Sequence, residues 1–230
     1  MMDFEAKYWH LSQFQLSKRL SRHEMINMCN SLIMKYFKKG LQVCPENNIT
    51  KNVYFLKKGT IKIVSLCNNG EEIIKDIIKK GDIFGILGLL HGESEDDYAV
   101  ALEDAVVCII DVETLKRMMA ENHHLNNYIF KLAGIRINKL ERRLESLIYK
   151  DAKTRIHEFV FDYLNEHGIE SGEFMVANFL LSNKDIGRLT STSRQTVSKT
   201  INHLKTKGII DFDKNTIKCR KSSSYIKKPN

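Results

Sequence analysis

The segment spanning residues 182–210 constrains this chain most, because it predicts two short helices joined by a turn too short to hold a strand. Ser182 and Asp185 have the spacing of a capping box, which marks the start of the first helix. The turn is expected over residues 190–192. The second helix is predicted to open at Thr192 or at the serine after it, because Thr192 and the glutamine three residues on also fit a capping box.

The second helix has one apolar side and one polar side. Val197, Ile201 and Leu204 recur at helical spacing and are expected to face inward. The opposite side carries no acid and consists of Arg194, Gln195, Ser198, Lys199, Asn202 and Lys205. Arg and Lys donate to guanine O6 and N7 and Gln pairs with adenine, so this side has the chemistry to read DNA bases. A solvated helix face is the alternative interpretation.

A hairpin is predicted directly after the second helix, because residues 209–212 and 216–219 flank turn residues at 213–215. Two helices followed by such a hairpin form a winged helix-turn-helix. The segment SRQTVSKTINHLKTKGII resembles the recognition helix and wing of the Crp/Fnr transcription regulators, whose pattern is roughly S-R-E-T-V-x-R.

The resemblance implies that Arg194, Gln195 and Lys199 occupy base-reading positions, with Ser198 beside them. Gln195 stands where the family commonly has Glu, and Lys199 stands where it commonly has Arg. Glu accepts from cytosine whereas Gln pairs with adenine, so we expect an operator that differs from the family's usual half-site. The residues expected to position phosphates are Thr192, Ser193, Thr196 and Lys205.

The positive charge of the chain is concentrated in this region. Residues 182–230 contain 12 Lys and Arg against 3 Asp, whereas residues 1–181 contain 24 basic and 25 acidic side chains. The whole surplus behind the net charge of +8 therefore lies on the segment proposed to meet the phosphate backbone.

Residues 41–111 consist of short β-rich runs separated by turns, and Asn68-Asn69-Gly70 is a strong hairpin signal because Asn-Gly accepts positive φ. Strands at this spacing predict an antiparallel sandwich or barrel. The segments YFLKKGTIKIVSLCNNGEE and KKGDIFGILGLL resemble the β-roll of the cyclic-nucleotide-binding fold that Crp/Fnr regulators carry. Residues 1–38 are predicted to be helical.

The candidate effector pocket departs from the nucleotide-binding members of the family, which hold ribose with a Glu and the cyclic phosphate with an Arg followed by Ser or Thr. Ile86 takes the Glu position, and Asp96 and Asp97 take the Arg and Ser positions, with Phe84 and Leu87 alongside. An apolar side chain cannot accept ribose hydroxyls and two carboxylates repel a phosphate, so cyclic AMP is not expected as the signal. The acidic residues are expected to lie on a surface loop, although they could bind a cation.

Other sensors of this superfamily carry an iron–sulfur cluster or haem. The five cysteines are scattered without any C-x-x-C spacing, and only Cys29 and Cys44 lie near the N-terminus, so neither a disulfide framework nor a four-thiolate cluster is expected. Haem remains open, and the candidate axial ligands are His91, His123, His124, Cys44 and Cys67.

A long helix is predicted after Asn122, which can cap it. The a/d seam of this helix, with spacings of three and four, consists of Phe130, Ala133, Ile137, Leu140, Leu144 and Leu147. A second stripe, Leu125, Ile129 and Leu132, could rest on the β-roll. Two apolar faces imply two partners, so the seam predicts a homodimer, which would present two recognition helices to adjacent half-sites. A single buried helix is the alternative.

The predicted fold is α+β, with an antiparallel β-roll sensor domain and flanking helices (1–121), a dimerisation helix and hinge (122–150), and a winged helix-turn-helix domain (151–230). We expect a sequence-specific transcription regulator of Crp/Fnr type that binds double-stranded DNA as a homodimer. The resemblance implies RNA polymerase as a further partner. A constitutive DNA-binding protein without an effector and a haem-based gas or redox sensor remain open as alternatives.

Membrane and enzyme functions are not expected. No run of about 18 apolar residues and no signal-peptide pattern occurs, so we expect a cytoplasmic protein with no membrane partner. The chain contains no Walker loop, H-E-x-x-H motif, glycine-rich dinucleotide loop or Ser-His-Asp ordering, so we predict neither catalysis nor a metal site.

Overall fold

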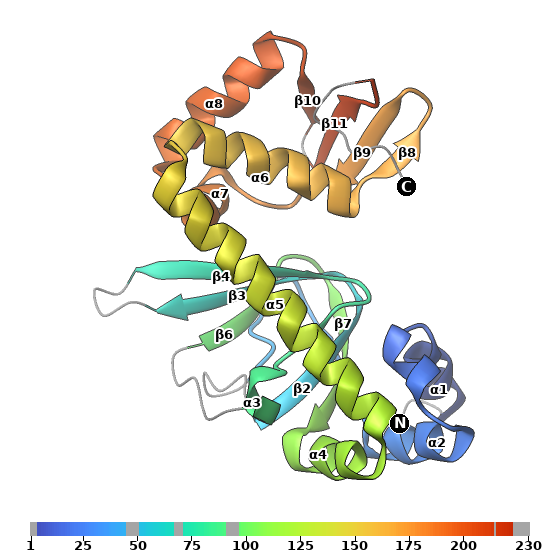
Figure 1. The fold of residues 1–230 in the computed structure, drawn as a ribbon. Coiled ribbons are helices and arrows are strands. Elements are labelled where there is room, and N and C mark those ends of the chain that lie inside the picture. Colours follow the sequence, from blue (N-terminus) through green and yellow to red (C-terminus); the bar gives the residue numbers. More distant parts are fainter. Residues whose placement is uncertain (1–3, 45–50, 67–70, 91–96, 214, 223–230) are drawn as a thin grey trace. The chain divides into compact units, whose positions relative to one another are not determined.

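The computed structural model divides into two units, Met1–Leu140 and Glu141–Asn230, each described here by itself (Figure 1). The structure describes residues 4–44, 51–66, 71–90, 97–213 and 215–222. The predicted Asn68-Asn69-Gly70 turn lies outside the described residues, but the strands on either side of it pair in antiparallel fashion, as a hairpin requires.

The first unit combines two antiparallel sheets with helices at both ends of the sequence. Its elements are α1 (Phe4–Ser12), the 3-10 helix η1 (Gln15–Arg19), α2 (Arg22–Ser31), β1 (Ile33–Phe37), β2 (Asn52–Lys58), β3 (Thr60–Leu66), β4 (Glu72–Lys79), β5 (Ile83–Phe84), α3 (Leu87–Leu90), β6 (Asp97–Ala101), β7 (Ala105–Asp111), α4 (Val112–Glu121) and the first part of α5 (His123–Tyr149). The strand orders are β1-β7-β2-β5 and β4-β3-β6. The β-rich prediction for residues 41–111 is thus confirmed.

The alternation of side chains along β2 builds two separate cores. Val53 and Phe55 pack with α1, α2, α4 and the start of α5, while Tyr54 and Leu56 pack among residues of both sheets. Successive residues of a strand point to opposite faces, so a continuous apolar run can serve both sides. All four of these side chains are at most 1% exposed.

The helical prediction for residues 1–38 was wrong at its end. Helix α2 stops before Leu32, and residues 33–37 form strand β1, which pairs antiparallel with β7 from Ile33 opposite Ile109 to Phe37 opposite Ala105. Helical periodicity in the preceding residues hid this short segment, whose strand conformation is stabilised by pairing with a distant part of the chain.

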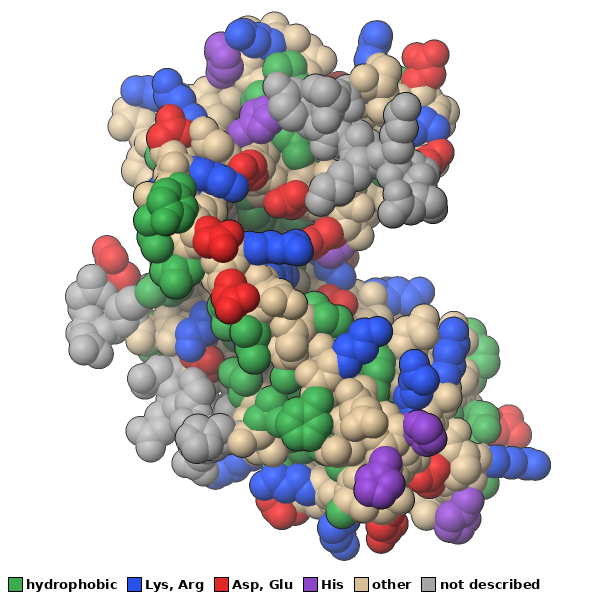
Figure 2. Space-filling view, in the orientation of Figure 1, with side chains coloured by type: hydrophobic (Ala, Val, Ile, Leu, Met, Phe, Trp, Pro, Cys, Tyr) green, Lys and Arg blue, Asp and Glu red, His purple; other side chains and the backbone are tan. Residues whose placement is uncertain are grey.

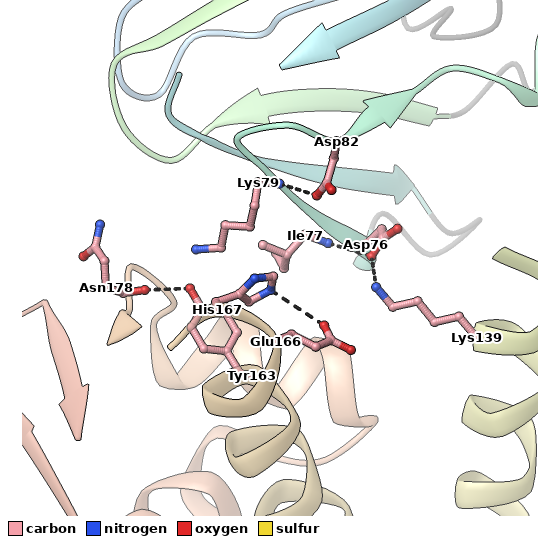
Figure 3. Close-up of polar contacts among 9 residues, drawn as sticks. All are labelled: Asp76, Ile77, Lys79, Asp82, Lys139, Tyr163, Glu166, His167 and Asn178. Atoms are coloured by element: carbon pink, nitrogen blue, oxygen red, sulfur yellow. Dashed lines mark hydrogen bonds and ion pairs between the residues drawn. The ribbon is translucent and has the colours of Figure 1, made fainter. Parts of the chain in front are cut away.

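The second unit combines the end of α5 with three further helices and a small sheet. Its elements are α6 (Ala152–His167), β8 (Ile169–Ser171), β9 (Phe174–Asn178), α7 (Asn183–Thr190), α8 (Arg194–Thr206), β10 (Ile210–Asp213) and β11 (Thr216–Arg220). The strand order is β10-β11-β9-β8, and β10 with β11 is the predicted hairpin. The Tyr163 hydroxyl on α6 donates to the Asn178 carbonyl at 2.7 Å, which fixes the helix to the end of β9 (Figure 3).

The cap predicted for the long helix is confirmed, and α6 starts with a cap of the same kind. The Leu125 N–H donates to Asn122 Oδ1 at 2.9 Å, and the Thr154 N–H donates to Asp151 Oδ1 at 2.8 Å. Hydrogen bonds from Thr154 hold the pKa of the Asp151 carboxyl below its ordinary value. Because Asp151 caps α6 immediately after α5 ends at Tyr149, the connection between the two helices is short and defined.

Candidate DNA-binding face and sensor site

The capping box that marks the start of α7 is present. The Ser182 side chain accepts from the Asp185 N–H at 3.2 Å, and the Asp185 carboxylate accepts from the Ser182 N–H at 3.0 Å. Ile186 is completely buried one residue later. Local sequence signals therefore set the start of the first helix of the helix-turn-helix, as predicted.

The turn between α7 and α8 is tighter than the sequence suggests. Ser191 adopts a left-handed conformation with φ of 52°, and the Thr190 hydroxyl donates back to the Ile186 carbonyl at 2.8 Å. A Cβ on Gly187 would lie 2.7 Å from the Thr192 carbonyl oxygen, so only glycine admits this approach of the turn to α7.

Of the two predicted starts of the second helix, the serine after Thr192 is confirmed, whereas the capping box at Thr192 was wrong by one residue. Ser193 is the N-cap of α8, and its hydroxyl accepts from the Thr196 N–H at 3.0 Å. The Thr192 N–H instead donates to the Gly187 carbonyl at 2.8 Å, and its hydroxyl bonds to that of Thr190 at 3.0 Å. Because the N–H and hydroxyl of Thr192 bond to α7, the Ser193 hydroxyl caps α8 instead.

Helix α8 has the two predicted sides. Val197, Ile201 and Leu204 are at most 6% exposed. On the other side Arg194, Gln195 and Lys199 are exposed and Ser198 is half-buried. No acidic residue occurs in this helix, so its exposed side offers donors without a competing carboxylate.

The four residues predicted to position phosphates already have intramolecular bonds. Besides the Thr192 contact, the Ser193 and Thr196 hydroxyls lie 2.9 Å apart, and Lys205 Nζ donates to the Phe212 carbonyl at 3.3 Å. Three of them shape the turn and cap, and Lys205 joins α8 to the wing strand β10. A hydroxyl keeps further hydrogen-bonding capacity, so these contacts leave the phosphate role as a prediction.

Arg155 is a residue that the sequence analysis missed. It extends from the first turn of α6, and its guanidinium donates to three carbonyl oxygens: Nε to Thr190 at 2.9 Å, Nη1 to Lys150 at 2.7 Å and Nη2 to Ser191 at 3.1 Å. The available signal was a basic residue directly beside the apolar stripe of α6. Periodicity cannot show which distant carbonyls such a side chain reaches.

The sensor-side candidates do not form one pocket in the described residues. Phe84 is completely buried, stacks on Tyr54 with ring centroids 4.7 Å apart, and belongs to the core between the sheets. Ile86 is buried in the other core, with the terminal helices, because Gly85 turns the backbone with φ of 81°. Leu87 opens α3 and is 42% exposed. Asp96 lies outside the described residues.

Asp97 is not on a surface loop as expected. It is the first residue of β6, its side chain is 5% exposed, and Lys75 Nζ lies 2.5 Å from its carboxylate. Lys75 reaches it from a β-bulge, because Ile63 pairs with Asp76 while Val64 pairs with Ile74, which leaves Lys75 as the extra residue. The carboxylate that was expected to repel a phosphate is thus neutralised by the protein itself.

The same bulge holds α5 against the sheet within the first unit. Asp76, next to Lys75, accepts from Lys139 Nζ on α5 at 2.8 Å and from the Ile77 N–H at 3.0 Å (Figure 3). Two consecutive residues of the bulge therefore contact β6 and α5 respectively. Both ion pairs retain an exposed lysine, so their energetic contribution is small, but their geometry links the two elements.

The haem-ligand candidates occupy different environments. His123 and His124 are exposed in the first turn of α5, and His91 and Cys67 lie outside the described residues. Cys44 is completely buried in the core between the sheets, and burial raises the pKa of its thiol to about 11. Cys44 is therefore a neutral packed thiol at physiological pH.

The two apolar faces of α5 differ in burial. Leu125 and Ile129 are completely buried against the first unit. The members of the exposed apolar stripe are Phe130, Ile137, Leu140, Leu144 and Leu147, at 55%, 56%, 54%, 60% and 39% exposure. Ala133, also predicted in the seam, is 8% exposed and lies at the border of the buried face. Figure 2 shows hydrophobic side chains gathered along the course of α5.

Comparison with known proteins accounts for this arrangement. The family profile of the cyclic nucleotide-binding domain matches residues 34–122, and that of the Crp-like helix-turn-helix domain matches residues 155–221. The chain belongs to the Crp/Fnr family. Like the other Crp/Fnr proteins that it resembles, it is a DNA-binding transcription regulator.

Curated Crp/Fnr relatives match over most of their length. The global nitrogen regulator of Synechococcus elongatus is 26% identical over 188 residues, covering 81% of this chain and 85% of that protein. The fumarate and nitrate reduction regulatory protein of Escherichia coli is 24% identical over 204 residues, covering 87% and 80%. These proteins are similar to this regulator, and their signals are properties of their own.

Solved structures agree on the Crp/Fnr fold. FixK2 from Bradyrhizobium japonicum superposes with a TM-score of 0.72 at 22% identity, covering 82% of this chain and 92% of FixK2. A CooA variant from Carboxydothermus hydrogenoformans superposes with a TM-score of 0.67 at 22% identity, covering 82% and 83%. Within the described part of the present regulator, none of the helices is both long and apolar enough to cross a bilayer.

Proposed function

We propose that this Crp/Fnr regulator recognises a specific operator as a homodimer and responds to a signal other than cyclic AMP. The observation that carries the proposal is the acid-free face of α8, where Arg194, Gln195 and Lys199 are exposed beside half-buried Ser198. Arg and Lys favour guanine and Gln favours adenine, so these four residues read bases. Phosphate contacts come from Thr192 in the turn, from Ser193 and Thr196 at the start of α8, and from Lys205 near the end of α8.

The homodimer forms through the exposed apolar stripe of α5. Five large apolar side chains at heptad-like spacing on a 27-residue helix form the seam of a coiled coil, and a second copy covers it most simply. A dimer then presents two copies of α8 to half-sites about one helical turn apart, which matches the two-fold symmetry of most operators of such proteins.

The signal is not cyclic AMP because the residues at the expected nucleotide positions do not suit it. Ile86 is packed in a core away from Phe84, and Asp97 already has its own cation in Lys75. A signal that alters the start of β6 reaches α5 through the bulge at Lys75 and Asp76, since Asp76 holds Lys139. RNA polymerase is the further partner of such a regulator.

The direct test is selection of preferred duplexes from a random library by the full-length protein, followed by sedimentation and titration. We expect an enriched site with two-fold symmetry, a sedimenting mass near twice 26.7 kDa, and no change in operator affinity on adding cyclic AMP. Enrichment of no sequence, a monomer that binds single half-sites, or a cyclic AMP response would each refute one part of the proposal.

A constitutive DNA-binding protein is the second candidate function, and the Lys75–Asp97 ion pair favours it. An internal cation on Asp97 supplies from within the protein the charge balance that a ligand would supply. Operator binding that is tight in purified protein and unaffected by cell extract supports this candidate. A haem-based sensor is distinguished from both by a Soret band in the purified protein.

A further inference from the structure

The three carbonyl contacts of Arg155 serve the ends of two different helices. Lys150 follows the last residue of α5, and its N–H closes the final turn of that helix by donating to the Ser146 carbonyl at 3.1 Å. Thr190 is the last residue of α7, and Ser191 is its C-cap. Carbonyls at helix C-termini lack intrahelical donors and favour a nearby cation. One guanidinium therefore caps both α5 and α7.

The capped carbonyls of α7 belong to the turn that sets the course of α8. Ser191 is the one described non-glycine residue with a positive φ, and α8 starts three residues after it. The backbone from residue 190 to Ser193 is closed further by the Thr192 contact with Gly187. A shift of the Ser191 carbonyl thus moves the N-terminus of α8, where the exposed reading residues Arg194 and Gln195 lie.

We propose that Arg155 is a positioning residue for DNA reading, which locks the C-terminus of α5 to the helix-turn-helix turn and thereby sets how α8 presents Arg194 and Gln195. The inference rests on the proposed operator recognition and adds the residue that fixes the position of the N-terminus of α8. This role also explains why the residue is an arginine, whose rigid guanidinium donates to all three carbonyls. A lysine donates from a single ammonium and cannot reach three carbonyls in the same geometry.

The test compares three full-length variants. Arg155→Gln removes the charge and the fork, Arg155→Lys keeps the charge without the fork, and Lys153→Gln is the control that removes a charge from an exposed residue of the same helix turn. Each is titrated with the duplex that wild-type protein enriches from a random library and with a scrambled duplex of equal length and composition. Amide hydrogen exchange is followed by mass spectrometry in the peptide spanning residues 188–196.

We expect Arg155→Gln to lower the ratio of operator affinity to scrambled-duplex affinity by about tenfold or more, and Arg155→Lys to lower it by less, because misplaced base contacts affect only the specific complex. The salt dependence of scrambled-duplex binding should match that of the Lys153→Gln control, since phosphate contacts are retained. Amides of the 188–196 peptide should exchange faster, while peptides from β2 and β7 keep their wild-type protection.

The inference is overturned if Arg155→Gln and Lys153→Gln have the same affinity ratio. It is also overturned if both DNA affinities of Arg155→Gln fall equally, which is the result of a purely stabilising cap. If wild-type protein enriches no duplex, operator recognition fails, and the exchange experiment decides the clamp by itself. Unchanged exchange at the turn then rejects Arg155 as the lock, and faster exchange supports it.

Discussion

The exposed residues at the start of α8 are the ones we propose to read DNA bases, and their exposure follows from local spacing. Val197, one of the buried residues, lies between Gln195 and Lys199 in sequence but on the other side of the helix. Gln195 differs from the Glu common in the family and offers both a donor and an acceptor. Its role is therefore open to a single-residue test.

Gln195→Ala should weaken binding to the preferred operator by about 1–3 kcal/mol and relax base choice at one position of each half-site, because a bidentate contact to adenine is lost. Titration against the operator and its single-base variants measures both effects. Glu173→Ala, which changes an exposed side chain between β8 and β9 and outside the polar side of α8, is the control. Equal weakening on every duplex would show that Gln195 does not read bases.

The buried thiol of Cys44 links stability to alkaline pH. Its pKa of about 11 in the folded protein lies above the ordinary thiol pKa of about 8.5 in the unfolded chain. The contribution to stability is therefore complete below pH 8.5 and is lost as the pH rises toward 11, because the unfolded chain releases the proton first.

We expect the free energy of unfolding of the wild-type protein to fall between about pH 8.5 and 11, and to fall less steeply in Cys44→Ala. That variant is less stable at pH 7 because of the cavity. Urea denaturation at each pH measures this. Cys108→Ala should behave similarly, since burial also raises the pKa of that thiol to about 11. Parallel pH profiles of wild type and both variants would contradict the assignment.

At the scale of elements, the geometry of the helix-turn-helix depends on one close approach. A Cβ on Gly187 would lie only 2.7 Å from the Thr192 carbonyl oxygen, so the backbones of α7 and the turn are in contact. Ser191 completes the reversal with its left-handed conformation. This backbone contact therefore limits how α8 can be placed relative to α7.

Gly187→Ala should lower the free energy of unfolding by about 1–3 kcal/mol, because the added methyl group forces the turn away from α7. Gly134→Ala on α5 is the matched control. Nothing lies within 4 Å of the added Cβ there, so the same change should stabilise the helix by about 0.5–1 kcal/mol. Urea denaturation distinguishes them, and destabilisation of equal size in both variants would refute the steric explanation.

At the scale of the whole molecule, the exposed apolar stripe of α5 needs an interaction partner that shields it from water. Its five members are exposed on a single chain, yet a contiguous apolar stripe in water indicates an interaction surface. We have assigned this surface to a second copy. A dimer formed in this way would engage two half-sites together, so dimerisation and operator affinity should be lost together.

Leu140→Glu should convert the dimer to a monomer, because it places a charge in the centre of the stripe. Operator affinity should fall by about 100-fold or more as bivalent binding is lost. Sedimentation velocity and operator titration measure the two effects. Asn138→Glu introduces the same charge at an exposed position off the stripe and should retain the dimer. A Leu140→Glu dimer with wild-type operator affinity would refute the seam.

The sequence by itself determined the local features of this protein. Capping residues such as Ser182 and Asp151 set helix starts, and apolar spacing set the inward side of α8, because such signals depend on neighbours within one or two turns. The β-rich character of residues 41–111 was also predicted, because apolar runs and turn residues are local signals as well. The positive charge concentrated in residues 182–230 also indicates DNA binding from the sequence alone.

Only the tertiary structure decided features that depend on distant partners. Pairing with β7 turned residues 33–37 into a strand, and the bulge at Lys75 placed a cation on Asp97. The guanidinium of Arg155 donates to the carbonyls of Thr190 and Ser191, which lie 35 and 36 residues away in the sequence. These outcomes come from long-range hydrogen bonds and ion pairs, and no local pattern of residue types specifies which donor meets which acceptor.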